Sequence, residues 1–178
     1  MSFQKILVGL APTPANQIVF EAALELAIAN NAQLFLFHSI SADSMIAPPT
    51  FSGDLGLSPH LIEQAYQVEQ IQIDNQTRYI KEYLTDLCEQ AVQRGVRVES
   101  ASQIDEPGRS LCKKAEEWDA DLIIVGRRGR SGFAEALLGS VSNYVLHHSP
   151  CTVMVVQGQK KTESKLEEAS VAETVASS

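Results

Sequence analysis

The stretch DLIIVGRRGRSGFAEALLGSVSNYVL, residues 121–146, carries the most information about the fold of this chain. It begins with an apolar run that stops at Gly126, as a buried strand does where it meets a turn. Three glycines and three arginines crowd into residues 126–132, and Gly139 and Ser140 then open a segment that stops before Pro150. The stretch therefore predicts a buried strand, a glycine-rich loop and a helix.

The rest of the chain repeats this alternation. We expect the other strands at residues 5–10, 32–40, 96–102 and 151–156, and the other helices over about 15–31, 60–94 and 107–120. Most strand runs are apolar throughout, which is typical of a parallel sheet covered on both faces. With right-handed crossovers, this pattern predicts an α/β fold, a doubly wound five-stranded parallel sheet with helices on both faces.

Two details of the helices are also predicted. Gly95 stands where a glycine commonly follows the last turn of a helix. In the segment of residues 15–31, four apolar residues recur at helical spacing and indicate the helix: Ile18, Ala22, Leu26 and Ala29.

Length and composition limit the class of protein. The chain has 178 residues and a net charge of -8, and we expect one domain over residues 1–157 followed by a disordered acidic tail over 158–178. The acidic balance argues against nucleic-acid and membrane partners. Cys88, Cys112 and Cys151 are far apart and lack CxxC spacing, which indicates reduced thiols in a cytoplasmic protein.

The glycine-rich loop is placed where such sheets bind ligands. Doubly wound sheets bind beyond the carboxyl ends of the strands where the winding reverses, so the loops after the first and fourth strands should meet there. Glycines let the backbone form a concave nest for anions, and a helix beginning at Ser140 offers unpaired N–H groups and a positive dipole end. The loop therefore predicts a phosphate site. The alternative is that the glycines make turns and Ser140 caps the helix.

The spacing of Gly126, Gly129, Gly139 and Ser140 is G-x2-G-x9-G-S. It resembles the nucleotide motif of the universal stress protein family, and the resemblance extends over about residues 3–157 through KILV, LFLFHSI, DADLIIVG and SPCTVMVV. The resemblance implies an α/β fold of the adenine nucleotide alpha hydrolase-like type. It also implies a regulatory protein of the stress response that binds ATP or a related adenine nucleotide (ADP or AMP), with Mg²⁺ as a candidate companion of the phosphates.

The resemblance also implies site residues and partners. Val125 and Gly126 would lie near the ribose and phosphates, and the loop and the helix start would contact the phosphates. A homodimer through residues 152–156 is implied as well, with a further protein partner of unknown identity. The full set of expected nucleotide-binding residues is Gly9, Leu10, Ala11, Ser39, Val125, Gly126, Arg128, Gly129, Gly139, Ser140, Val141 and Ser142.

Ala11 departs from the family pattern, because ATP-binding members usually carry an aspartate at the end of the first strand. A lost charge-assisted hydrogen bond is worth about 1.5–3 kcal/mol, or roughly tenfold to a hundredfold in affinity. Ser39 is more polar than the valine that is usual at its position. The phosphate half of the site thus matches the family and the nucleoside half is altered, which leaves open weaker ATP binding or a different nucleotide.

Other polar residues admit two interpretations each. The arginines at 127, 128 and 130 either close over phosphates or are solvated loop charges. Asp105 and Glu106 could hold Mg²⁺, but acidic residues at a helix start are usual, and no metal site is expected. His38 is interpreted as a hydrogen-bonded histidine at the edge of the core. No catalytic residue is assigned, so the alternatives to a regulatory nucleotide-binding protein are a nucleotide-independent dimeric interaction module and a slow ATP hydrolase.

Overall fold

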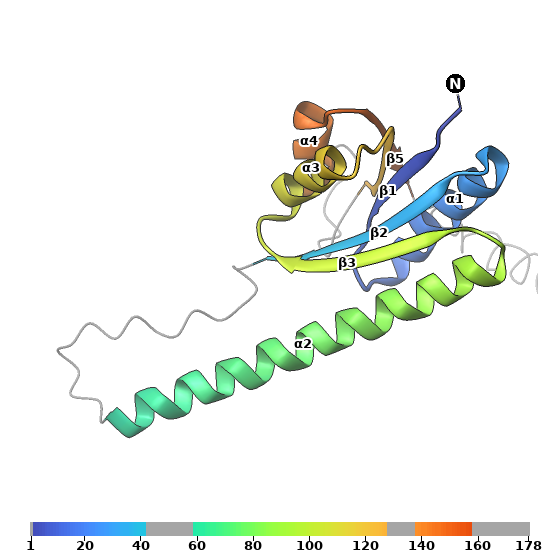
Figure 1. Ribbon diagram of the computed structural model, residues 1–178. Coiled ribbons are helices and arrows are strands. Elements are labelled where there is room, and N and C mark those ends of the chain that lie inside the picture. Colours follow the sequence, from blue (N-terminus) through green and yellow to red (C-terminus); the bar gives the residue numbers. More distant parts are fainter. Residues whose placement is uncertain (1, 42–58, 128–137, 158–178) are drawn as a thin grey trace, which may run out of the picture.

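A computed structural model describes residues 2–41, 59–127 and 138–157 of the chain. Its centre is a five-stranded sheet in the order β3-β2-β1-β4-β5, in which every neighbouring pair is parallel (Figure 1). The strands are β1 (Lys5–Gly9), β2 (Gln33–Ile40), β3 (Val98–Ile104), β4 (Leu122–Gly126) and β5 (Thr152–Val156).

Four helices connect the strands and cover both faces of the sheet (Figure 1). One buried cluster joins the sheet to the first two helices and a second joins its other face to the last two. The predicted doubly wound α/β fold is therefore confirmed. The helices are α1 (Pro14–Asn30), α2 (Pro59–Gln93), α3 (Pro107–Glu117) and α4 (Ser140–His148).

The apolar strand runs explain this layering. Ile6 and Val8 belong to the cluster under α1 and α2, and Leu7 belongs to the cluster under α3 and α4. All three side chains are fully buried, because alternate residues of a strand point to opposite faces and both faces are covered. Each such side chain contributes about 1.5–3 kcal/mol through its removal from water.

The helix ends follow the sequence closely. Asn31, with φ of 53°, ends α1 in the left-handed conformation, and Gly95, with φ of 77°, follows α2 as predicted. The third strand begins two residues later than expected. Val96 still belongs to the turn, since its N–H donates to the carbonyl oxygen of Ala91.

The apolar residues whose spacing indicates α1 are not the ones that its packing buries most. Ile18 is 39% exposed, Ala29 is exposed and Ala22 is partly buried, whereas Leu26 is partly buried and packs against the core. The face that packs on the sheet lies one residue further along the helix. It consists of Asn16, Val19, Phe20, Ala23, Leu24 and Ala27.

Helix α2 is much longer than the sheet it covers (Figure 1). The helical spacing of Ile73, Ile80, Leu84, Leu87 and Ala91 predicts an apolar stripe on this helix; the last four are buried against β2 and β3, whereas Ile73 is only partly buried. Towards the start of the helix, Tyr66 is more than half exposed. Among the described residues, none of the helices is both long and apolar enough to span a membrane.

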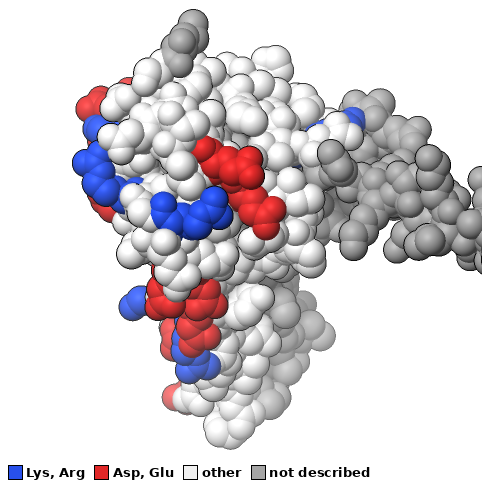
Figure 2. Space-filling model, turned by 90° about the vertical axis from the view of Figure 1, so that its right-hand side faces the viewer, with Lys and Arg blue, Asp and Glu red and all other residues white. Residues whose placement is uncertain are grey.

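One face of the molecule shows how its charges are distributed (Figure 2). Basic and acidic side chains lie there in small groups, with uncharged surface between them. A nucleic-acid-binding surface instead presents a continuous basic patch or stripe.

Candidate functional site

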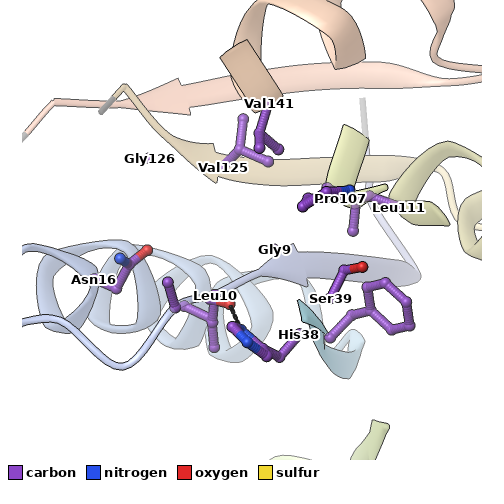
Figure 3. A pocket seen from close by; sticks show the side chains of 12 residues that line it. Gly9, Leu10, Asn16, His38, Ser39, Pro107, Leu111, Val125, Gly126 and Val141 are labelled. Atoms are coloured by element: carbon purple, nitrogen blue, oxygen red, sulfur yellow. Dashed lines mark hydrogen bonds between the residues drawn. The ribbon is translucent and has the colours of Figure 1, made fainter. Parts of the chain in front are cut away.

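A pocket opens at the carboxyl ends of β1, β2 and β4 (Figure 3). β1 and β4 are neighbours in the sheet, and the chain leaves them towards opposite faces, so the pocket lies at the point where the winding reverses. Residues from three strands and three helices contribute to it. The lining residues are Gly9, Leu10, Ala11, Asn16, Phe37, His38, Ser39, Pro107, Leu111, Val125, Gly126 and Val141.

Two glycines allow the strand ends to approach the helices closely. A Cβ atom on Gly9 would lie 2.8 Å from Cδ2 of Leu111 and 3.1 Å from Cγ1 of Val125. A Cβ atom on Gly126 would lie 3.1 Å from Cγ2 of Val19. At both strand ends, the backbone rather than a side chain therefore forms the surface next to the pocket.

The turn after β1 is held from two sides. Leu10 donates its N–H to the carbonyl oxygen of Phe37 at 2.9 Å, and Nδ1 of His38 lies 2.7 Å from the carbonyl oxygen of Leu10. His38 is buried, which confirms its interpretation as a hydrogen-bonded histidine at the core edge. On the α2 side, the hydroxyl of Tyr83 donates to the carbonyl oxygen of Ala11 at 3.3 Å. This end of the pocket is thus fixed by neighbouring elements.

The proton of Tyr83 is retained at neutral pH. Burial, and to a lesser extent the neighbouring Tyr79, raise the pKa of Tyr83 above its usual value. The phenol therefore remains a hydrogen-bond donor to the turn after β1.

The acidic pair before α3 serves the start of that helix. Glu106 is the N-cap, and its carboxylate accepts hydrogen bonds from the N–H groups of Gly108 at 3.1 Å and Arg109 at 2.7 Å. Asp105 accepts the N–H of Glu106 through Oδ1 at 2.7 Å, and its carbonyl oxygen accepts the hydroxyl of Ser39 at 2.8 Å. The structure thus supports the helix-start interpretation of the pair.

The start of α4 is organised differently, because no side chain of the described residues caps it. Gly139 is the N-cap, and its carbonyl oxygen accepts the N–H of Asn143 at 2.9 Å. The N–H groups of Ser140, Val141 and Ser142 precede the first helical hydrogen bond and have no acceptor within the helix. Since Val141 lines the pocket, the positive end of the α4 dipole is next to it.

Ser142 fastens the residues on either side of the loop. It is 1% exposed, and its hydroxyl lies 3.0 Å from the carbonyl oxygen of Gly139 and 3.3 Å from that of Arg127 as donor. The hydroxyl hydrogen is therefore used within the protein. Ser140, by contrast, is exposed at the first position of the helix.

The structure brings most of the sequence-predicted residues together. Gly139, Ser140 and Ser142 surround the start of α4. Arg128, Gly129 and Arg130 lie outside the described residues, as do residues 42–58 and the expected tail at 158–178. The predicted residues that line the pocket are Gly9, Leu10, Ala11, Ser39, Val125, Gly126 and Val141.

Sequence reasoning missed the lining residues contributed by α1 and α3 and two from β2. Asn16 carried a signal, because it precedes Val19 and Phe20 by three and four residues and so shares their buried helical face. Pro107 and Leu111 show the same spacing at the start of α3. Phe37 and His38 gave no separate signal within an apolar strand.

Comparison with known proteins now places the chain in a family. The model of the universal stress protein family matches residues 2–157. The chain belongs to the universal stress protein family. Among its relatives, universal stress protein Sll1388 of Synechocystis is 36% identical over 161 residues, covering 88% of this chain and 99% of the relative. Universal stress protein A homolog 2 of Coxiella burnetii is 31% identical over 161 residues, covering 88% and 96%.

Solved structures share the fold of this universal stress protein. Protein MJ0577 superposes with a TM-score of 0.73 at 20% identity, covering 90% of this chain and 100% of its own. A universal stress protein in complex with cAMP has a TM-score of 0.58 at 24% identity, covering 88% and 98%. One from Archaeoglobus fulgidus in complex with dAMP has a TM-score of 0.54 at 20% identity, covering 87% and 98%.

Proposed function

We propose that this universal stress protein is a cytoplasmic regulatory protein that binds an adenine nucleotide, namely ATP, ADP or AMP, in the pocket between β1 and β4. One observation carries the proposal. The uncapped first turn of α4 and the glycine ends of β1 and β4 meet at the switch point of the sheet, where backbone donors and a positive dipole end favour a phosphate.

The phosphate end of the proposed site is the start of α4. Ser140 and Val141 supply N–H groups there, and the exposed hydroxyl of Ser140 is a further donor. The glycine-serine spacing of the loop supports the same assignment, and Arg128 and Gly129 are expected to complete it. A Mg²⁺ ion bound to the phosphates is compatible with this arrangement.

The nucleoside end is the turn after β1 and the end of β2. Leu10 and Ala11 offer backbone groups there, and Phe37, Pro107 and Leu111 provide apolar walls. A neutral heteroaromatic ring suits such a mixture of apolar walls and a few polar groups. The family members solved with cAMP and dAMP support an adenine nucleotide as the ligand.

A regulatory role follows from where the chain leaves the pocket. β2 ends just before residues 42–58, and β4 ends just before residues 128–137. Nucleotide occupancy can therefore bias both segments directly, which is the two-state behaviour that a protein partner would detect.

We also propose that the protein is a homodimer through β5. β5 is the last strand of the sheet order and pairs with β4 alone among the described strands. Its side chains are apolar apart from Thr152, and Met154 is 40% exposed. An apolar edge strand of this kind is an aggregation hazard unless it is covered, and pairing with its two-fold mate covers it.

The nucleotide assignment is tested by denaturing gently purified protein and identifying the released ligand by chromatography with mass detection. We expect an adenine nucleotide, or micromolar to millimolar binding when ATP, ADP or AMP is added to empty protein. A protein that is empty and fails to bind all three in the millimolar range would contradict the proposal. That result would favour the nucleotide-independent dimeric interaction module, which Ala11 already favours.

A further inference from the structure

Asn16 is a buried polar side chain in the wall of the pocket. It lies in the first turn of α1 and is 6% exposed. Its Nδ2 atom donates to Oγ1 of Thr13 at 2.7 Å, and its N–H donates to the carbonyl oxygen of the same threonine at 2.9 Å. The side chain is therefore held in one orientation by the N-cap residue of its own helix.

The carboxamide oxygen of Asn16 has no such partner. Oδ1 accepts no hydrogen bond from any described residue, and it lies 3.6 Å from where a Cβ atom of Gly126 would be. In Figure 3 the oxygen of Asn16 is on the Gly126 side, and the nitrogen is turned away from it. No fully buried side-chain nitrogen or oxygen atom of the described residues lacks a hydrogen-bond partner, so Oδ1 is itself accessible, and the direction in which it is accessible is the pocket that Asn16 lines.

Other polar groups around the pocket already have partners. Nδ1 of His38 is bound to the turn after β1, and the hydroxyl hydrogens of Ser39 and Ser142 are donated to backbone carbonyl oxygens. Oδ1 of Asn16 is thus an uncommitted acceptor that is already oriented, and it requires no rearrangement to bind a ligand.

We propose that Asn16 determines specificity in the nucleotide site, with Oδ1 accepting a hydrogen bond from a ribose hydroxyl group. The proposal rests on the proposed function, since it concerns the ligand of the same pocket. In this site, a neutral carboxamide from α1 recognises the sugar, while the end of β1 carries the methyl group of Ala11 instead of a carboxylate.

The chemistry of the ligand selects the hydroxyl. Ionised phosphate oxygens only accept hydrogen bonds, so they do not pair with Oδ1. Two groups of an adenine nucleotide donate, the ribose hydroxyls and the amino group of the base. In Figure 3, Gly126 lies between Val141, at the proposed phosphate end, and Leu10, at the proposed nucleoside end. The sugar is the part of a nucleotide between phosphate and base, and its hydroxyls are therefore the donors next to Asn16.

The test compares four nucleotides on the full chain by calorimetric titration: ATP, 2′-deoxy-ATP, 3′-deoxy-ATP and inosine triphosphate. All four have the same phosphates, so the affinity ratios isolate the sugar and the base amino group. For the natural protein we expect one deoxy nucleotide to bind about 2- to 10-fold more weakly than ATP, as the loss of one hydrogen bond predicts.

Two variants of Asn16 identify the acceptor. Asn16→Leu has a similar size and no polar atom, so ATP and its deoxy analogue should bind with equal affinity. Asn16→Asp presents only acceptors, so the preference for the hydroxyl should remain even if all four affinities fall through repulsion of the phosphates. Gln17→Leu is the matched control, because Gln17 is the next residue of α1 and is not among the pocket-lining residues. It should keep the ratios of the natural protein.

Each result decides one point. Natural protein that binds none of the four nucleotides contradicts the proposed function itself. Natural protein that binds ATP and both deoxy nucleotides equally, or Asn16→Leu protein that keeps the difference, overturns the role of Asn16 alone. Loss of the ratio in Asn16→Asp protein overturns the acceptor role. A weaker affinity for inosine triphosphate that disappears only in Asn16→Leu protein overturns the sugar assignment in favour of the base. If Asn16→Leu protein does not fold, Asn16→Ala protein takes its place, and a difference between ATP and its deoxy analogue that persists there overturns the role of Asn16.

Discussion

The backbone N–H of Gly139 donates a hydrogen bond of 2.7 Å to the carbonyl oxygen of Arg127. This bond joins the end of β4 to the N-cap of α4, although residues 128–138 lie between them in the sequence. The hydroxyl of Ser142 lies within hydrogen-bond distance of the carbonyl oxygens of both Arg127 and Gly139. The proposed phosphate end is therefore fixed by residues that flank the loop, whatever the loop itself does.

Ser142→Ala should lower the stability of the protein and weaken nucleotide binding together. The substitution removes a buried hydroxyl that joins the two flanks of the loop, which should cost about 1 kcal/mol of unfolding free energy. Urea unfolding measures the stability, and calorimetric titration with ATP measures the affinity, which we expect to fall several-fold.

Ser140→Ala is the matched control two residues away. Ser140 is exposed, so its replacement should change stability by less than about 0.5 kcal/mol. The affinity for ATP should still fall, because a donor to the phosphates is lost. If the two serine variants lost stability equally, the assignment would be wrong in which Ser142 joins the two flanks of the loop and Ser140 only binds the phosphates.

Gly9→Ala tests the close contact at the base of the pocket. The new methyl group would lie 2.8 Å from Cδ2 of Leu111 and would push that side chain into the pocket. We expect a loss of about 1–3 kcal/mol of stability, as for other overpacked sites, and weaker binding of ATP. Thermal unfolding and titration of the same sample measure the two effects.

Gly95→Ala is the control for Gly9→Ala, because it should lower the stability of the protein without changing the binding of ATP. Gly95 has φ of 77° and open space around the position of a Cβ atom, so alanine there is strained by about 1–2 kcal/mol without touching the pocket. Its affinity for ATP should equal that of the natural protein. If Gly95→Ala protein lost affinity as much as Gly9→Ala protein, the effect on binding would come from general destabilisation.

Ala11→Asp should tighten the binding of adenine nucleotides. Ala11 lines the pocket in the turn after β1, and a carboxylate there would add a charge-assisted hydrogen bond to the nucleotide, worth roughly tenfold to a hundredfold in affinity. Ala11→Asn adds a neutral group of the same shape and should give a smaller gain. If Ala11→Asp protein bound ATP no more tightly than the natural protein, Ala11 would not be the residue that limits the affinity at the nucleoside end of the site.

The sheet was predictable from the sequence because buried parallel strands read as continuous apolar runs, as β1 and β4 do. The face of α1 was not, because apolar residues surround most of that helix and its periodicity does not single out one side. Ile18 and Val19 are neighbours of equal apolarity, and only packing against the sheet buries Val19 and exposes Ile18.

The candidate site was predictable where a short segment of sequence builds it. Gly126, Gly139 and Ser140 are close in the chain, and their spacing is itself the signal. Pro107 and Leu111 enter the pocket only because α3 packs on the sheet, against β2 and with Leu111 next to Gly9 at the end of β1, a tertiary arrangement that their shared helical face alone does not predict. The site therefore combines a motif that can be read from the chain with walls that only the fold assembles.

The buried thiol of Cys112 should make stability depend on pH. The free energy of unfolding should fall as the pH rises above about 8.5, the ordinary pKa of a cysteine thiol. Burial, and then the neighbouring Cys151, raise the pKa of Cys112, so the folded state keeps this proton to a higher pH than the unfolded state does. The contribution of Cys112 to stability is complete below the pKa of the thiol in the unfolded state, and it is lost as the pH rises through the pKa of the thiol in the folded state. Urea unfolding under a phosphine reductant at pH 7.5 and pH 10 should show this fall. Cys112→Ala protein should show a smaller fall between the two pH values, and an equal fall would exclude Cys112 as a contributor.

The proposed dimer is tested at Val155 in β5. Arg127 donates its N–H to the carbonyl oxygen of Val156 at 2.8 Å, so the backbone groups of Val156 face β4 and those of Val155 face the open edge. Val155→Pro removes a donor at that edge without removing a bond to β4, which edge strands tolerate.

Light scattering after size exclusion should show a dimer for the natural protein and for Val155→Thr protein, and a monomer for Val155→Pro protein. The monomer should still bind ATP, since no residue of β5 lines the pocket among the described residues. A natural protein that is monomeric at micromolar concentration, or a Val155→Pro protein that stays dimeric, would exclude pairing through the β5 edge.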